Sequence, residues 1–173
     1  MNGSIFSNVN IVQLESYGGL TLEHVKNFEL WRLFASQLIH AKQMHMFYNV
    51  LSLIALGIFV ESYMNSVKFF LLWFISGATG TVASTLFIAP PWNLGTGGSQ
   101  AVLGIAGFSL ILSFKNINSS KWFYIALAFA IVPAFTLDFI HVGYTKFGHI
   151  VSLVIGVIVG LVIVESGKKP IQK

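Results

Sequence analysis

Residues 95–107 read GTGGSQAVLGIAG, a glycine-rich loop that runs directly into an apolar helix. Ser99 stands at the first position of this helix, where it would lie at or just below a membrane surface. Fifty residues further on, His149 follows Gly148 and opens another apolar run in the same way. A nucleophile and a base at equivalent places in two apolar helices indicate hydrolysis inside a membrane.

The composition is that of an integral membrane protein. The 173 residues are 55% hydrophobic and only 9% charged, and the mean hydropathy is +0.76, far above that of soluble domains. The absence of cysteine excludes disulfide bonds, thiolate metal sites and a cysteine nucleophile. The net charge is +4, and the charged residues lie between apolar segments. Their placement therefore reflects membrane topology, and we expect no nucleic-acid partner.

Five apolar runs have about the length that a membrane-spanning helix needs. They cover residues 44–60, 68–87, 99–114, 122–139 and 148–164. The pattern predicts an all-α fold, a polytopic membrane helix bundle with five transmembrane helices in one domain.

The lysines predict how the bundle is oriented. They lie after the first, third and fifth runs, at Lys68, Lys115, Lys121, Lys168, Lys169 and Lys173. By the positive-inside rule these ends and the carboxyl terminus are cytoplasmic, in what we expect to be a bacterial cell membrane. We therefore expect an outer-face segment and surface loop over residues 1–43, the transmembrane domain over 44–165, and a cytoplasmic basic tail over 166–173. Within the first part, residues 20–25 suit a short surface helix capped by Thr21.

Three polar side chains are expected at one depth. Ser99, His149 and His45 each precede the charged residue at the cytoplasmic end of their run by 16 positions. At 1.5 Å per residue this is about 24 Å, within a hydrocarbon core of roughly 30 Å. The three helices run in the same direction, so we expect their ends to converge on one water-filled cavity.

Ser99 has two interpretations. A serine after glycine at a helix start is most often an N-cap. The alternative is a nucleophile, because the helix amino terminus offers unpaired N–H groups and a positive dipole end to an oxyanion. Gly97 and Gly98 would leave room for a substrate backbone, and Gln100 completes this nucleophile loop.

His149 is either an interfacial polar residue or a general base. Its helix carries small residues at offsets of 3, 7 and 11, namely Ser152, Gly156 and Gly160. Such a stripe lets membrane helices pack closely, and Gly104 and Gly107 are the candidate packing positions on the Ser99 helix. Close pairing would bring imidazole and hydroxyl together, although helix packing alone also explains the stripe.

His45 and Asn49 are four residues apart and therefore share a helix face. Both side chains offer N–H donors, which suits an oxyanion site, whereas a structural polar pair is the alternative. The five histidines have no matching carboxylate cluster, so we expect no metal. Asp138 and His141 are expected in the wet outer loop.

Together these segments resemble the rhomboid family of intramembrane serine proteases, over about residues 31–165. Residues 97–107 are similar to the nucleophile segment of the family, and residues 148–152 with Gly156 resemble the segment that bears its catalytic histidine. His45 and Asn49 match its H-x-x-x-N motif. Trp31, Arg32 and His40 match the ordered surface loop that precedes this motif.

The resemblance implies peptide-bond hydrolysis by a Ser-His dyad, with no third carboxylate, no metal and no cofactor. Ser99 would be acylated and His149 would be the general base and acid. The Ser99 amide, His45 and Asn49 would hold the oxyanion. Substrates would be transmembrane helices, and the fourth span, which Pro133 could loosen, would be the gate in contact with membrane lipid.

The chain departs from the family at four points. Gln100 stands where glycine usually follows the nucleophile, and Leu103 stands where an aromatic ring commonly stacks on the histidine, so we expect looser orientation of His149. Ser152 replaces a glycine. The first of the usual six spans has no counterpart here, which is expected either of a sequence that begins late or of a five-span variant.

Two other functions compete with proteolysis. A non-catalytic rhomboid-like protein would bind transmembrane helices without cleaving them, although such relatives typically lose the serine or the histidine. A small channel or transporter is the third possibility. Neither an inverted repeat nor a charge pair buried at the midplane supports it.

Overall fold

The computed structural model describes residues 10–88, 93–140 and 147–165. The described residues form eight helices: α1 (Ile11–Ser16), α2 (Leu22–Lys26), α3 (Arg32–Leu38), α4 (Gln43–Val60), α5 (Ser66–Phe87), α6 (Ser99–Phe114), α7 (Lys121–Ile140) and α8 (Phe147–Glu165). The prediction of an all-α bundle is confirmed. The expected surface helix is also present as α2, where Thr21 accepts a hydrogen bond from the His24 backbone N–H.

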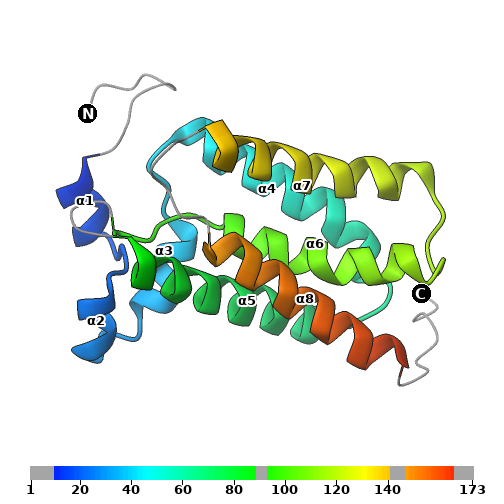
Figure 1. Cartoon of the computed structure of the whole chain (residues 1–173), viewed down its shortest axis with the longest axis horizontal. Coiled ribbons are helices and arrows are strands. Elements are labelled where there is room, and N and C mark those ends of the chain that lie inside the picture. Colours follow the sequence, from blue (N-terminus) through cyan, green and yellow to red (C-terminus); the bar gives the residue numbers. More distant parts are fainter. Residues whose placement is uncertain (1–9, 89–92, 141–146, 166–173) are drawn as a thin grey trace.

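The three helices expected to run in parallel do so. Figure 1 shows that α4, α6 and α8 begin at the end of the bundle where α1, α2 and α3 lie, whereas α5 and α7 run back toward that end. The side chains at the starts of α4, α6 and α8 are therefore gathered at one end of the molecule. This arrangement brings together residues that are about 100 positions apart in the sequence.

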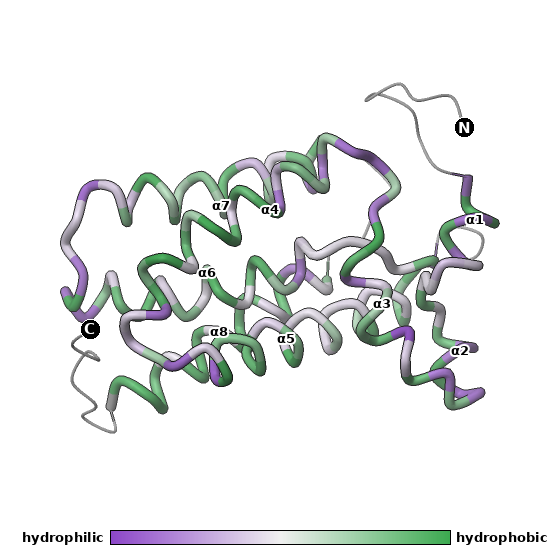
Figure 2. The backbone as a smooth tube through the Cα atoms, turned by 180° about the vertical axis from the view of Figure 1, so that it is seen from behind, coloured by the Kyte–Doolittle hydropathy of each residue, from purple (hydrophilic) through white to green (hydrophobic). Residues whose placement is uncertain are grey.

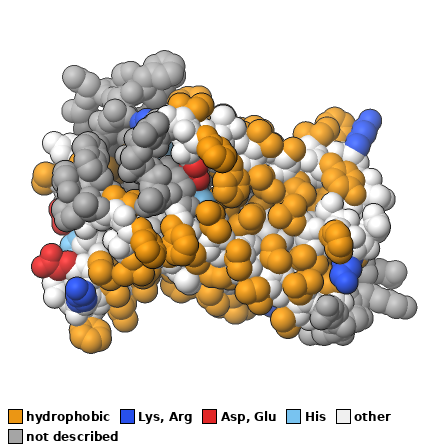
Figure 3. Space-filling model, viewed as in Figure 1, with side chains coloured by type: hydrophobic (Ala, Val, Ile, Leu, Met, Phe, Trp, Pro, Cys, Tyr) orange, Lys and Arg blue, Asp and Glu red, His pale blue; other side chains and the backbone are white. Residues whose placement is uncertain are grey.

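Four helices are long and apolar enough to cross a membrane: Gln43–Val60, Ser66–Phe87, Lys121–Ile140 and Phe147–Val164. The fifth apolar helix, α6, has only 16 residues, about 24 Å of helix against roughly 30 Å of hydrocarbon. The backbone is mostly hydrophobic along the long helices, whereas hydrophilic and hydrophobic residues alternate over α1 and α2 (Figure 2). On the face seen in Figure 3, hydrophobic side chains cover the middle of the molecule and lysine or arginine side chains lie toward its two ends. The chain is an integral membrane protein.

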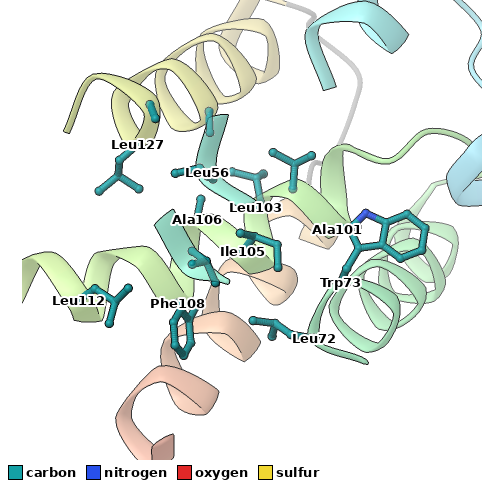
Figure 4. Packing of buried hydrophobic residues seen from close by; sticks show 14 of the residues in the cluster. Leu56, Leu72, Trp73, Ala101, Leu103, Ile105, Ala106, Phe108, Leu112 and Leu127 are labelled. Atoms are coloured by element: carbon teal, nitrogen blue, oxygen red, sulfur yellow. The ribbon is translucent and has the colours of Figure 1, made fainter. Parts of the chain in front are cut away.

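Helix α6 is the centre of the bundle. Of its side chains, Leu103, Ile105, Phe108 and Leu112 are fully buried. Figure 4 shows them against Leu56 of α4, Leu72 and Trp73 of α5, and Leu127 of α7. Because lipid is as apolar as these side chains, close packing rather than escape from water holds membrane helices together.

The closest packing is between backbones. A Cβ at Gly156 would overlap the carbonyl oxygen of Gly104, and a Cβ at Gly107 would overlap that of Leu153. Helices α6 and α8 are therefore in direct backbone contact. At Gly160, a Cβ would lie 2.9 Å from the Cβ of Ile111, closer than real side chains approach. Helix α7, by contrast, packs mainly along α4 and α6 and has few contacts with α8 among the described residues.

The segment before α4 is held together by Arg32. Its Nη1 donates to the carbonyl oxygens of Glu15 and Gly19, at 2.5 and 3.0 Å, and its Nε donates to Glu29 at 2.6 Å. One side chain thus ties α1, the turn that follows it and the start of α3 together. The expected outer position of this segment stays a prediction, and the expected basic tail lies outside the described residues.

Candidate active site

The loop before Ser99 is fixed by hydrogen bonds to the amino-terminal segment. Gly97 has a φ of 102°, a conformation that residues with a side chain rarely adopt. Its N–H donates to the carbonyl oxygen of Ser36 at 2.8 Å. Two residues earlier, Gly95 exchanges backbone hydrogen bonds of 3.0 and 2.7 Å with Leu20. The position of Ser99 at the start of α6 thus depends on a segment far from it in sequence.

Ser99 and His149 are in contact. The hydroxyl oxygen of Ser99 lies 2.8 Å from Nε2 of His149, and each residue is only 5% exposed. The start of α8 packs directly against the backbone of α5. The contact is so close that a Cβ at Gly148 would overlap the carbonyl oxygen of Gly80 on α5. The hydroxyl of Ser152 also lies 2.9 Å from the carbonyl oxygen of Ser76 on the same helix. Small residues therefore set the distance between serine and imidazole.

A carboxylate lies on the other side of the imidazole ring. Oδ2 of Asp138 is 2.7 Å from Nδ1 of His149, and the Asp138 side chain is 10% exposed. Two expectations are therefore wrong: Asp138 does not lie in a wet loop, and the histidine does have a carboxylate partner. Asp138 lies in the last turn of α7, which ends at Ile140, and the hydrogen bond from His149 stabilises a carboxylate that would otherwise be costly in an apolar helix. His141 lies outside the described residues.

The carboxylate defines the proton positions on His149. A carboxylate only accepts hydrogen bonds, so Nδ1 carries the proton and donates a hydrogen bond to Asp138. Nε2 of the neutral ring is then an acceptor, and it faces the Ser99 hydroxyl. Because both ring nitrogens are bonded, the orientation of His149 is not loose, although Leu103 provides no aromatic ring to stack on it.

Gln100 adds a second polar contact to the serine. Its Oε1 lies 3.2 Å from the Ser99 hydroxyl oxygen, and the side chain is buried. A hydroxyl has one proton, so donation to Gln100 competes with donation to His149. The residue that stands in place of the usual glycine therefore touches the nucleophile directly.

His40 links the loop before Ser99 to α4. Its Nε2 lies 3.1 Å from the Gly98 nitrogen and 3.0 Å from Nδ2 of Asn49. Both partners are N–H donors, so this nitrogen is an unprotonated acceptor, and Nδ1 carries the proton toward the Leu38 carbonyl oxygen, 3.3 Å away. Burial lowers the pKa of His40 below the usual histidine value, and the Leu38 carbonyl opposes this change.

The two residues of the H-x-x-x-N pair lie at this end of the bundle, but Asn49 is bonded to His40. Asn49 is 3% exposed, and the bond to His40 uses one of the two N–H groups of its amide. The His45 ring lies 5.7 Å from that of His40 and 6.3 Å from that of Tyr48, between centroids. Among the described residues, no group of three His, Asp or Glu side chains is arranged to bind a metal ion.

Sequence reasoning missed three features of this site: the carboxylate of Asp138, the acceptor role of His40 and the contact of Gln100 with the serine. A signal existed for the first one. An acidic residue inside an apolar helix marks a functional site by default, and residues 122–139 were predicted to span the membrane. The contacts of His40 and Gln100 depend on the path of the loop, which carries no such signal.

The sequence matches one family of known proteins over most of its length. The rhomboid domain family matches residues 27–166. The chain is 33% identical over 153 residues to RHOMBOID-like protein 4 of Arabidopsis thaliana, which covers 87% of this chain and 38% of that protein. It is 32% identical over 137 residues to Inactive RHOMBOID-like protein 8 of the same plant, covering 78% and 37% of the two chains.

A bacterial relative is Rhomboid protease GluP of Bacillus subtilis, 29% identical over 109 residues, which cover 63% of this chain and 21% of that protein. The chain thus spans less than two-fifths of the length of these relatives. Their names include both a protease and an inactive protein, so the relationship alone does not decide whether this chain is active. With its apolar helical bundle and a match over most of its length, the chain belongs to the rhomboid family.

Proposed function

We propose that this protein is an intramembrane serine endopeptidase, with Ser99 as the nucleophile and His149 as the general base and acid. The observation that carries the proposal is the 2.8 Å contact between the Ser99 hydroxyl and Nε2 of His149. The two side chains are buried at the start of two helices that are in backbone contact. A serine and a neutral imidazole within hydrogen-bond reach are the pair that nucleophilic catalysis needs.

The reaction would proceed in two stages. Ser99 Oγ attacks the carbonyl carbon of the scissile bond while Nε2 of His149 takes the hydroxyl proton. The imidazolium then gives this proton to the leaving amine, so that the C–N bond breaks and the acyl group stays on Ser99. Water, deprotonated by the same nitrogen, attacks the ester, releases the carboxylate product and restores the serine. This hydrolysis needs no metal and no cofactor.

Three donors would stabilise the oxyanion: the backbone N–H of Ser99, His45 and the second amide N–H of Asn49. The first N–H groups of α6 have no acceptor within the helix, and they lie at its positive dipole end. Inside a bundle of apolar side chains such donors act in a low dielectric, where they are worth more than in water. The bond from Asn49 to His40 would hold its amide near the loop.

The substrates would be transmembrane helices of other membrane proteins, entering beside α7. This helix packs along α4 and α6 and has few contacts with α8, so a substrate could enter along its length while its end stays bonded to His149 through Asp138. Three lysines lie at the end of the bundle away from the site. Lys68 is near the start of α5, Lys115 directly follows α6, and Lys121 begins α7. By the positive-inside rule that end, and the carboxyl terminus with it, would be cytoplasmic.

Labelling with a fluorophosphonate tests the nucleophile. We expect the purified protein, in detergent or lipid vesicles, to react covalently and to cleave a transmembrane-helix substrate. Ser99→Ala and His149→Ala should lose both activities. The matched control is Ser109→Ala, a second buried serine of α6 whose hydroxyl bonds only to the Ile105 carbonyl oxygen; this variant should label like the parent.

Labelling that persists in Ser99→Ala would assign another nucleophile and refute the proposal. A folded parent that neither labels nor cleaves would favour the alternative of a non-catalytic protein that binds transmembrane helices. That alternative has a precedent in the relative named as inactive, with 32% identity.

A further inference from the structure

The pair of Ser99 and His149 is extended by a third residue on a third helix. Asp138 of α7 bonds to Nδ1 of His149 at 2.7 Å, while Nε2 of the same ring bonds to Ser99 at 2.8 Å. The three side chains are almost completely buried. They form a continuous chain of hydrogen bonds from carboxylate to imidazole to hydroxyl, drawn from α7, α8 and α6.

We propose that Asp138 is a positioning residue for catalysis, which holds His149 in the tautomer and orientation that the serine requires. The proposal rests on the proposed function, because it assigns a role within the same site. Asp138 does not touch the substrate and does not change its own protonation. It accepts the hydrogen bond from Nδ1–H throughout, so that only Nε2 can take the serine proton.

The charge of Asp138 also fits the reaction. When His149 takes the serine proton, a positive imidazolium forms in a buried place, which is costly without a counter-charge. The carboxylate at 2.7 Å provides that charge where it is needed. A neutral partner of the same shape would orient the ring but would leave the imidazolium uncompensated.

Hydrogen bonds on both ring nitrogens define the orientation of the His149 imidazole. Ser99 provides the partner of Nε2, and Asp138 provides the partner of Nδ1 on the opposite side of the ring.

Three substitutions at Asp138 separate charge from shape. Asp138→Asn keeps the shape, removes the charge and can present an N–H to Nδ1, which would put the ring proton on Nε2. We expect kcat and the fluorophosphonate labelling rate to fall roughly 10²- to 10⁴-fold with little change in KM. Asp138→Ala should be similarly slow. Asp138→Glu keeps the charge and should retain more activity than Asp138→Asn, whereas a merely structural role would favour the isosteric asparagine.

The control variant on the same helix is Thr136→Ala. Among the residues that the structure describes, the Thr136 hydroxyl bonds only to the Val132 carbonyl oxygen of its own helix, so this variant should have the labelling rate of the parent. Size-exclusion behaviour and thermal unfolding in detergent show which variants fold. Folded Asp138→Asn with a labelling rate within about threefold of the parent would overturn the proposal.

A spectroscopic readout makes the test independent of activity. In protein labelled with ¹⁵N-histidine, neutral His149 should carry its proton on Nδ1 in the parent and lose this preference in Asp138→Asn and Asp138→Ala. His149→Ala assigns the signal. An Nε2–H tautomer in the parent would overturn the proposal even if Asp138→Asn does not fold. A parent that does not label but shows the Nδ1–H tautomer would refute the proposed function while leaving the placement by Asp138 intact.

Discussion

The hydroxyl of Tyr48 on α4 lies 2.9 Å from the carbonyl oxygen of Phe129 on α7. This carbonyl would normally accept from the N–H four residues later, but that residue is Pro133, which has no N–H. The tyrosine can therefore provide the donor that the helix lacks. Its single proton is shared with the carbonyl oxygen of Ala130, which lies 2.7 Å away. A proline inside an apolar helix is tolerated when a neighbouring helix satisfies the freed carbonyl in this way.

Tyr48→Phe should therefore destabilise the protein by about 0.5–1.5 kcal/mol, because the Phe129 carbonyl loses its donor. The measurement is the free energy of unfolding in mixed detergent micelles. In a Pro133→Ala background the restored N–H serves the carbonyl, so the same substitution should cost much less. Equal costs in the two backgrounds would show that Tyr48 does not compensate for the proline.

Gly156→Ala should destabilise the bundle by about 1–3 kcal/mol, because the added methyl group would overlap the carbonyl oxygen of Gly104. Gly57→Ala is the matched control within α4. There the new Cβ would lie 3.4 Å from Cζ of Phe69, an ordinary contact, and alanine favours helix by up to about 1 kcal/mol. The free energy of unfolding of Gly57→Ala, measured in the same micelles, should be equal to or higher than that of the parent. A Gly156→Ala variant as stable as the parent would mean that α6 and α8 separate freely.

The position of Ser99 and His149 could be predicted because helix length and direction follow directly from the sequence. Apolar runs mark the spans, each opens with a polar residue, and counting 1.5 Å per residue places these residues at one depth. Backbone contact between α6 and α8 was equally readable from Gly104, Gly107 and Gly156, since small residues at helical spacing have few other uses in a membrane. These signals are local or periodic.

The carboxylate of Asp138 could not be assigned in the same way. Its partner lies on another helix, and the 11 positions that separate Asp138 from His149 include residues 141–146, whose sequence has no hydrophobic periodicity. The contacts of His40 and Gln100 fail for the same reason, because they depend on a turn at Gly97 and on bonds to Ser36. Side chains that meet across loops are fixed by tertiary structure, to which pattern reasoning has no access.

Gln100→Ala should label faster with the fluorophosphonate than the parent, by about two- to tenfold. Without Oε1 at 3.2 Å, the single proton of the Ser99 hydroxyl is directed to His149 alone, which is the state from which the nucleophile reacts. Alanine is preferred to glycine here because it adds no backbone freedom at the start of α6. Slower labelling would instead assign Gln100 a supporting role, as a donor to the serine oxygen or to the oxyanion.

Stability should rise with pH in the range below the usual histidine pKa because of His40. Burial lowers its pKa in the folded state, so the unfolded chain binds more protons there, and the free energy of unfolding increases with pH. The contribution of His40 to stability is fully present above the pKa of histidine in the unfolded chain, about 6.5. It is lost as the pH falls from that value through the lowered pKa of the folded state. Unfolding measured across this range should show a smaller pH slope in His40→Gln, whose side chain offers an acceptor that does not titrate.

Labelling of Ser99 should follow the same pH dependence. Protonated His40 cannot accept from the Gly98 N–H or from Asn49, to which it is bonded at 3.1 and 3.0 Å, so the loop before Ser99 loses its anchor. Comparison with His40→Gln isolates the effect of His40 from that of any other group that titrates at low pH. The parent should lose labelling at a higher pH than the variant does. Superimposable pH profiles would mean that the charge of His40 has no influence on the nucleophile.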